Sequence, residues 1–210
     1  MPKQIQELVG KYCREPVKVS VTPESTTAER IDQYLFMVQQ DEKQTLLEMI
    51  LKERHEVPGE FERVLIFART KHGCDRIVKK LGQAGIPANA IHGNKSQAAR
   101  TRALAQFKDG SLPVLVATDF AARGLDIDQL PHVVNYELPN VEEDYVHRIG
   151  RTGRAGREGR ALLLVTPRER RMLQVIERVT GQKVGEVKLP NAQQVLDARI
   201  KKLTTGITPL

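Results

Sequence analysis

The chain has 210 residues, of which 40% are hydrophobic, so it can bury a core in one large domain with an appendage. Lys and Arg total 33 against 26 Asp and Glu, and the resulting formal charge of +7 favours an anionic partner such as nucleic acid. Aromatic residues make up only 4% and Trp is absent, which argues against an extensive base-stacking platform and favours contacts to backbone phosphates.

In chain order, the first sixteen residues have a short amphipathic pattern that predicts a helix. The strand-like VKVSV and a polar stretch follow, which predicts a linker with a boundary near residues 22–28. Further on, the runs predicted as strands are VLIFA (64–68), AIHG (90–93), VLVAT (114–118), HVVNYE (132–137) and ALLLVT (161–166). The segments predicted as helices begin near Lys71 and at Ser96, the latter with Ala98, Arg102, Leu104 and Phe107, and cover 142–150, 167–181 and part of the tail after Pro190.

These strands are apolar throughout rather than alternating, which indicates burial on both faces, and the intervening helices serve as crossover connections. The pattern predicts an α/β fold, a doubly wound parallel sheet with helices on both faces. Ligands of such sheets bind beyond the carboxyl ends of the strands. The loops after residues 64–68, 90–93 and 114–118 are therefore the candidate site.

Neither cysteine lies in a metal-binding or disulfide pattern. Cys13 and Cys74 have no Cys-x-x-Cys spacing and no nearby paired His, so no metal site is predicted and a reducing compartment is indicated. No apolar run approaches the roughly 18 residues of a membrane span, and the polar start is not a secretory signal. We therefore expect a cytoplasmic protein without a membrane partner.

The segment HRIGRTGRAGREGR (147–160) places an Arg at every third position and a Gly at every third position. Collagen would need many more triplets and proline, and glycines that each cost roughly 1 kcal/mol relative to Ala oppose a long helix. A helix that ends in an arginine-rich loop fits better. Glycine lets backbone approach a ligand, and guanidinium groups match phosphate oxygens, so the run is predicted to bind phosphates; the alternative is a solvated charged face.

The segment ATDFAARGLDI (117–127) leaves an apolar strand directly into polar residues and glycine. Thr118 offers a hydroxyl and a backbone N–H to a phosphate, and Asp126 could accept a hydrogen bond from a ribose hydroxyl. The alternative for each of these residues, Gly124 included, is an ordinary turn. Their joint position at the end of a strand favours a nucleotide or nucleic-acid site.

The segment IHGNKSQAARTRAL (91–104) runs from a strand end through Gly93 to a helix that begins near Ser96. A helix N-terminus favours anions, and Gln97 and Arg100, three residues apart, share one face of the helix. The alternative is a solvated first turn. Arg100 beside the glycine loop favours phosphate binding.

The sequence contains no G-x-x-x-x-G-K-[ST] motif and no acidic tetrad after an apolar strand. These are the parts that hold nucleotide phosphates and Mg2+ in P-loop enzymes. The chain is therefore expected to supply only half of a nucleotide site.

Four strings together resemble motifs of the carboxyl-terminal RecA-like domain of bacterial DEAD-box RNA helicases, over about residues 28 to 180. VLIFART is similar to motif IV, SQAAR to the Q-x-x-R of motif IVa, ATDFAARGLDI to motif V and HRIGRTGR to motif VI. The opening MPKQIQELVGKYCREPVKVSV resembles the end of the family's first RecA-like domain. The resemblance implies that the chain lacks most of that first domain.

The resemblance also implies roles for single residues. Arg151 and Arg154 would be arginine fingers on the γ-phosphate of ATP, with Asp126 and Gly124 beside the nucleotide. RNA phosphates would bind at the positions Arg100, Gln97, Thr118 and Gly93. His147 would couple the ATP and RNA sites unless it is an ordinary packing histidine, and Phe67 would pack beneath motif VI unless it is simply a core residue.

The expected division is a remnant of RecA-like domain 1 with a linker (1–27), RecA-like domain 2 (28–185) and a helical tail (186–210). The expected function is the C-terminal half of an ATP-dependent RNA helicase that unwinds short duplexes, with RNA backbone and RecA-like domain 1 as partners. ATP and Mg2+ would be held mainly by domain 1, so this chain alone should not hydrolyse ATP. The alternatives are a freestanding RNA-binding or regulatory module and, fitting the motifs less well, a DNA helicase.

Overall fold

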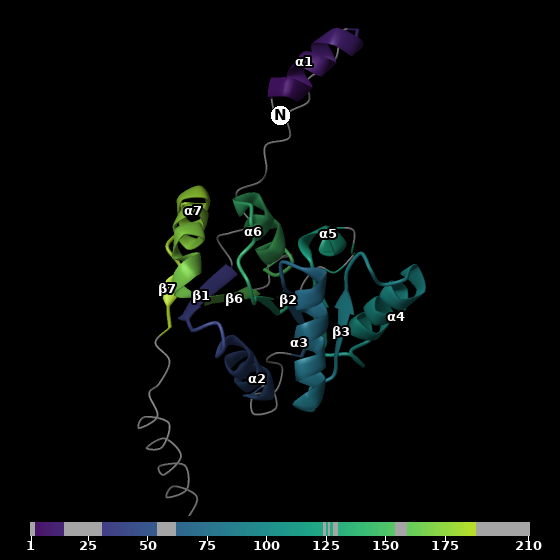
Figure 1. Ribbon diagram of the computed structural model, residues 1–210, viewed down its shortest axis with the longest axis vertical. Helices are drawn as coiled ribbons and strands as arrows, with labels where there is room; N and C mark the ends of the chain where they lie inside the picture. The colour runs from purple at the N-terminus through teal and green to yellow at the C-terminus, as the bar shows by residue number, and fades with distance from the viewer. Residues whose placement is uncertain are drawn as a thin grey trace, which may run out of the picture.

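Seven strands among the described residues form one sheet, and all neighbouring strands in it are parallel (Figure 1). The computed structural model describes residues 3–14, 31–53, 62–123, 125, 127, 130–153 and 159–187. The strands are β1 (Ile31–Met37), β2 (Val64–Phe67), β3 (Ala88–Ile91), β4 (Val114–Ala117), β5 (His132–Asn135), β6 (Gly159–Val165) and β7 (Gly185–Glu186). Their order across the sheet is β3-β4-β2-β5-β6-β1-β7. The predicted parallel α/β sheet is confirmed.

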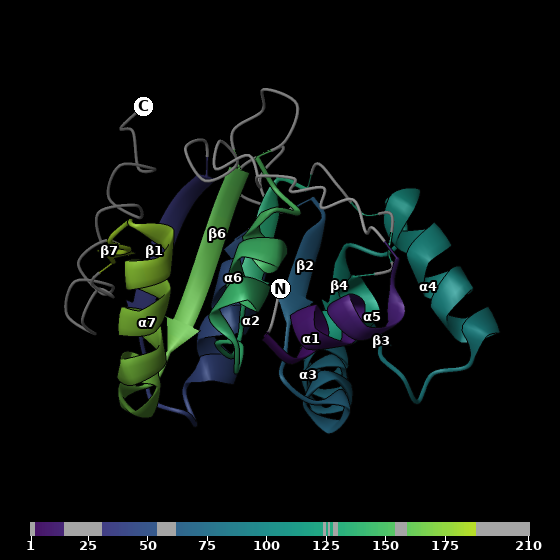
Figure 2. The ribbon, with the colours of Figure 1, turned by 90° about the horizontal axis from the view of Figure 1, so that it is seen from above.

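Helices cover both faces of the sheet. They are α2 (Lys43–Glu53), α3 (Lys71–Gln83), α4 (Gln97–Lys108), α5 (Asp119–Ala122), α6 (Glu142–Ile149) and α7 (Arg170–Thr180). A further helix, α1 (Lys3–Tyr12), precedes them in the chain and contributes no residue to the core clusters. Side chains of α2 and α3 share one core cluster, whereas α4 and α5 share a second and α6 and α7 a third. In both ribbon views α6 and α7 lie side by side next to β6 (Figures 1 and 2). No helix among the described residues is long and apolar enough to cross a lipid bilayer.

Strand β2 shows why its apolar run has no polar alternation. Val64 and Ile66 belong to the core cluster under α2 and α3, whereas Leu65 and Phe67 belong to the cluster on the opposite face. Successive side chains of a strand point to opposite faces, and all four are buried because both faces are covered by helices. The same continuous burial holds for β4 and β5.

The direction of the chain across the sheet decides which face each helix covers. The connection through α3 leads from β2 toward one edge of the sheet, and the connections through α4, α5 and α6 lead back the other way. Right-handed crossovers in opposite directions place their helices on opposite faces. Because the strands are parallel, the carboxyl ends of β2, β3, β4 and β5 lie at the same end of the sheet, where the predicted loops also lie.

Several local predictions need correction. The helix predicted over 167–181 begins instead with a 3-10 turn, Pro167–Glu169, before α7, because Thr166 and Glu169 form a capping box. In α4 the buried positions are Ala103 and Phe107. Ala98 and Arg102, which the sequence analysis named in the same helix, are exposed.

The single-turn helix α5 was not predicted, and the edge strand β7 lies across the expected boundary between residues 185 and 186. Helix α1 is confirmed. The strand-like VKVSV and the helix expected after Pro190 lie outside the described residues.

Candidate functional site

A cleft of about 380 Å³ lies at the carboxyl ends of β2, β3 and β4. We call it the Thr118 cleft; its lining residues are Arg69, Lys71, His92, Gly93, Thr118, Asp119, Phe120, Arg123 and Asp144. The structure thus brings Gly93 and Thr118, predicted from separate segments, to one cleft. This is the end of a parallel sheet where ligands of doubly wound folds bind.

The loop that carries Gly93 is held by side chains on either side of it. A methyl group added at Gly93 would meet no atom within 4 Å, so the backbone there faces open space. His92 is buried, its Nδ1 accepts a hydrogen bond from the Asn94 N–H at 3.3 Å, and its Nε2 therefore donates to Asp75 Oδ1 at 3.1 Å. Lys71 Nζ donates to Asn94 Oδ1 at 3.1 Å. These contacts fix an open stretch of backbone beside Thr118.

Asp75 has a second partner in this loop. Lys95 Nζ lies 2.8 Å from Asp75 Oδ1, and the hydrogen bond from Lys95 is the main reason that the pKa of Asp75 is lowered. The interactions of His92 and Asp75 were not expected from the sequence. A histidine directly before a strand-end glycine was the only available signal, because the two partners are 17 residues apart.

Gln97 and Arg100 lie on one face of α4, as their spacing predicted. Arg100 Nη1 donates to Gln97 Oε1 at 3.2 Å, and Ser96 caps the helix by accepting from the Ala99 N–H at 3.2 Å. Arg100 Nε is buried and has no hydrogen-bond partner among the described residues. Neither Gln97 nor Arg100 lines the Thr118 cleft, so together they form a second polar patch.

Arg148, the first arginine of the Arg/Gly run, is 1% exposed and does not face a ligand. Its Nε and Nη2 donate to the two carboxylate oxygens of Asp119 at 2.5 and 2.8 Å. Its Nη1 donates to Asn135 Oδ1 at 3.1 Å and to the Glu137 carbonyl at 2.6 Å, and the guanidinium lies 5.0 Å from the centre of the Phe67 ring. The prediction that the arginines of this run bind phosphates is therefore wrong for Arg148, which joins α6 to α5 and β5.

Phe67 satisfies both interpretations that the sequence left open. It is 1% exposed in the core, and it also packs against the first arginine of motif VI. Arginine over an aromatic face is attracted by the ring quadrupole as well as by dispersion. The packing of Phe67 thus connects the end of β2 to the arginine-rich segment.

The remaining predicted residues of motif VI lie just beyond this junction. Arg151 is half-buried, and its Nη1 donates to the Leu125 carbonyl at 3.1 Å. His147 is exposed, and its Nδ1 donates to the Glu143 carbonyl at 2.8 Å. Both line a small hollow that also includes Phe67, Asp119 and Arg148. The predicted site residues Arg154, Asp126 and Gly124 lie outside the described residues.

Two glycines of the run are required by the fold itself. Gly153 has φ +68°, in the left-handed region that suits glycine. A methyl group on Gly159 would lie 2.3 Å from the Gly153 nitrogen, which no packing tolerates. The close approach predicted from these glycines is thus, at Gly159, an approach to the backbone of Gly153.

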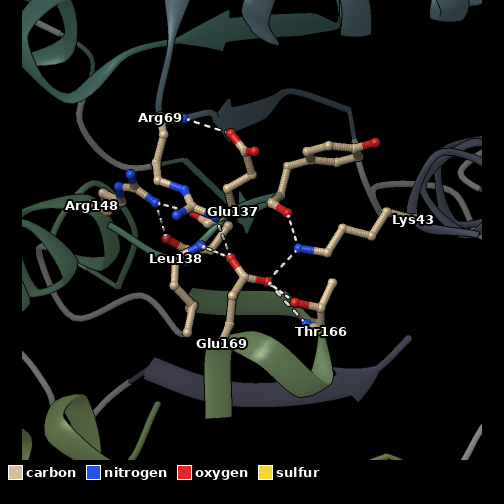
Figure 3. Close-up of polar contacts among 9 residues, drawn as sticks. Lys43, Arg69, Glu137, Leu138, Arg148, Thr166 and Glu169 are labelled. Atoms are coloured by element: carbon tan, nitrogen blue, oxygen red, sulfur yellow. Dashed lines mark hydrogen bonds and ion pairs between the residues drawn. The ribbon is translucent and has the colours of Figure 1, made fainter. Parts of the chain in front are cut away.

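A cluster of charged side chains around Glu169 lies near the carboxyl ends of β2 and β5 (Figure 3). Glu169 Oε2 accepts from Lys43 Nζ at 2.7 Å and from the Thr166 hydroxyl at 2.9 Å, while Glu169 Oε1 accepts from Arg69 Nη2 at 2.9 Å. Burial lowers the pKa of Lys43 more than Glu169 raises it. Burial also acts to raise the pKa of Glu169, but the hydrogen bonds from Lys43 and Thr166 together hold it below its usual value.

This cluster fixes the segment after β5 on which Arg148 rests. The Leu138 N–H donates to Glu169 Oε1 at 3.3 Å, and the Arg69 N–H donates to Glu137 Oε2 at 2.9 Å. Arg148 donates to the carbonyl of the same Glu137. Sequence reasoning missed Lys43 and Glu169, since 126 residues separate the two partners and neither belongs to a motif.

Fold and site together define a RecA-like domain: a doubly wound parallel sheet with polar loops at its strand ends and Arg148 and Arg151 beside them. The model of the helicase conserved C-terminal domain matches residues 41–156. The chain belongs to this family and is of the DEAD-box RNA helicase type.

Curated relatives match nearly the whole chain. It is 41% identical over 208 residues to the ATP-dependent RNA helicase DeaD of Mycobacterium tuberculosis, covering 99% of this chain and 36% of that protein. It is 44% identical over 204 residues to the RNA helicase CrhR of Synechocystis, covering 97% and 40%. The chain therefore spans well under half the length of these relatives.

A solved structure confirms the fold. The crystal structure of a DEAD box protein from Methanococcus jannaschii superposes with a TM-score of 0.70 at 35% identity, covering 90% of this chain and 49% of that chain. The predicted RecA-like fold and family resemblance are thus both confirmed.

Proposed function

We propose that this chain is the C-terminal RecA-like domain of an ATP-dependent RNA helicase, binding RNA phosphates and completing an ATP site held mainly by the first RecA-like domain. The observation that carries the proposal is the Thr118 cleft, where Gly93 backbone, the Thr118 position and basic side chains converge at the strand ends. The expected division into residues 1–27, 28–185 and 186–210 and the cytoplasmic location are part of the proposal.

The RNA side of the proposal rests on charge and open backbone. Arg69, Lys71 and Arg123 line the cleft, and Gly93 presents unobstructed backbone to it. Guanidinium, ammonium and backbone N–H groups are the usual donors to nucleic-acid phosphates. Arg100 and Gln97, which are hydrogen-bonded to each other on α4, would hold a further phosphate.

The carboxylates of the cleft do not suit a magnesium site. Asp119 is held by Arg148 through two hydrogen bonds, and Asp144 is paired with Arg123. A carboxylate already bound to a guanidinium is a poor ligand for Mg2+, which requires near-octahedral oxygen coordination. This supports the assignment of Mg2+ and the nucleotide phosphates mainly to the first RecA-like domain.

The ATP side of the proposal assigns Arg151 and Arg154 as fingers on the γ-phosphate, with Asp126 and Gly124 beside the nucleotide. Arginine fingers stabilise charge on the transferred phosphoryl group only when the two domains close. Arg151 must then exchange its hydrogen bond to the Leu125 carbonyl for a phosphate oxygen. Such an exchange allows hydrolysis to depend on closure.

Coupling between the two sites would run through Asp119 and Arg148. Asp119 lines the Thr118 cleft and binds Arg148, which precedes Arg151 by three residues and packs on Phe67. His147 lies next to Arg148 and lines the hollow that contains Arg151. A change at the RNA cleft can thus be transmitted to the finger segment through one buried side chain.

The test of RNA binding uses this chain and a fluorescently labelled single-stranded RNA. Fluorescence anisotropy should show weak binding that falls as salt rises, because phosphate contacts release counterions. Arg100→Ala should raise Kd about tenfold and reduce the log–log salt slope by about one, whereas the exposed Arg102→Ala on the same helix should change Kd about twofold. Affinity independent of salt, or equal effects of the two substitutions, would contradict the proposal.

A second test separates the helicase from a freestanding RNA-binding module. The isolated chain should show no RNA-stimulated ATPase, since its sequence holds no P-loop. In the complete protein, with its upstream coding sequence, RNA should stimulate ATP hydrolysis more strongly than DNA does. Absence of a P-loop upstream would favour the module, and stimulation by DNA alone would favour a DNA helicase.

A further inference from the structure

Phe120 is the most exposed large apolar side chain that the structure describes, at 84%, followed by Tyr12 at 73%. Single exposed apolar residues are ordinary and call for no explanation. Phe120 differs because it lines the Thr118 cleft, whose other lining residues are polar or glycine. An aromatic ring is therefore displayed to solvent at the edge of a basic cleft.

The backbone that carries this ring is fixed from both sides. Asp119, directly before Phe120, is held by the two hydrogen bonds from Arg148. Ala121 and Ala122, directly after it, are buried at 2% and 4% exposure in the core cluster below α4. The single turn of α5 must therefore leave Phe120 outside the core, and only its two side-chain torsions remain to be ordered by a ligand.

The surroundings of the ring indicate the class of ligand. Arg69, Lys71 and Arg123 give the cleft the chemistry of a phosphate site, and an RNA phosphate carries a base a few ångströms away. Every base has a π-face, so stacking on an aromatic side chain tolerates any sequence. Arg69 and Arg123 are paired with Glu169 and Asp144, whereas Lys71 Nζ donates to the neutral Asn94 side chain. A phosphate would balance the charge of Lys71, and a purely apolar polypeptide segment would not.

We propose that Phe120 stacks on a base of the single-stranded RNA whose phosphates bind in the Thr118 cleft. The inference rests on the proposed RNA-binding function and adds a base contact to it. With aromatic residues at only 4% of the chain, this is one stacking position and not a platform. It gives the domain a preference for unpaired RNA, because a base inside a duplex is already stacked and paired.

The test compares two fluorescently labelled oligoribonucleotides of equal length, one with all its bases and one with a central abasic stretch. Kd is measured by anisotropy at constant salt for the unchanged chain, Phe120→Leu and Phe120→Tyr. Met49→Ala, at an exposed apolar position on α2, serves as the matched control. Far-UV circular dichroism of each variant confirms that it is folded.

Phe120→Leu should weaken binding of the base-bearing RNA about fivefold or more, and of the abasic RNA by less than about twofold. Phe120→Tyr and Met49→Ala should stay within about twofold on both, and the salt slope should not change because no charge changes. If the unchanged chain binds neither RNA, both the proposed function and this inference fail. If the unchanged chain binds RNA but Phe120→Leu weakens binding of both oligonucleotides equally, or of neither, only the stacking inference is overturned. The exposed ring would then be assigned to contact with a polypeptide.

Discussion

Replacing Arg148 with Met tests whether the arginine-rich segment depends on a buried ion pair. Arg148 is 1% exposed, and its guanidinium makes four hydrogen bonds, two of them to Asp119. Met has a similar apolar stem but no donors, so Asp119 would lose the cation that compensates its partial burial. Breaking a buried pair costs about 3–5 kcal/mol, and because Asp119 is 21% exposed we expect the lower end. For a domain of this size that loss corresponds to a Tm roughly 6–12 °C lower.

The free energy of unfolding is measured by urea titration followed by far-UV circular dichroism, because the chain has no Trp. Arg102→Met, at an exposed position of α4, is the matched control and should change stability by no more than about 0.5 kcal/mol. Asp119→Asn in the Arg148→Met background should then cost much less than it does alone, because the pair is already broken. A loss below about 1 kcal/mol for Arg148→Met, or additive effects of the two changes, would refute the assignment of Arg148 as the junction of α5, β5 and α6.

In the complete protein, Arg154→Lys should lower the single-turnover hydrolysis rate at saturating ATP and RNA, whereas Arg100→Ala should mainly raise the RNA concentration required; equally severe rate losses would contradict the separate roles. The free energy of unfolding should fall as pH drops below about 4.5, the usual pKa of a glutamate. The pKa of Glu169 in the folded chain is lower than this, so the stability that ionised Glu169 contributes is lost as pH falls toward and through the folded pKa. Glu169→Gln should therefore flatten the acid limb of the urea midpoint plotted against pH, and an unchanged limb would show that other carboxylates dominate. Gly159→Ala should destabilise the chain by more than about 2 kcal/mol in urea titration, since its methyl group would overlap the Gly153 nitrogen, and a neutral effect would mean that the backbone at Gly153 can shift to accept it.

The sequence by itself was sufficient for the fold class and for most elements. The apolar runs at 64–68 and 114–118 carry no polar alternation, and such runs separated by amphipathic segments indicate strands covered on both faces. The start of α4 was equally predictable, because Ser96 caps it locally. Signals of this kind depend on residues a few positions apart, so no tertiary information is needed to find them.

The candidate site was predictable as a set of loops but not as a set of contacts. Gly93 and Thr118 were identified because each follows a strand, and parallel strands bring their carboxyl ends to one edge. The prominence of the arginines in the sequence was misleading for Arg148, since a period of three shows which residues are charged but not which are buried. Phe120 carried no signal at all, because exposure of an aromatic residue depends on what packs around it.

Only the tertiary structure determined how charge is distributed between the core and the cleft. The pairs Lys43 with Glu169 and Arg148 with Asp119 join residues that are 126 and 29 positions apart. Lys43, Glu169 and Arg148 are buried, and Asp119 is partly buried. Burial is what makes these pairs matter, because an ion removed from water must find a partner, whereas an exposed one such as Arg102 need not. The order of the strands sets which charges are removed from water, and that order is a property of the folded chain and not of any local segment.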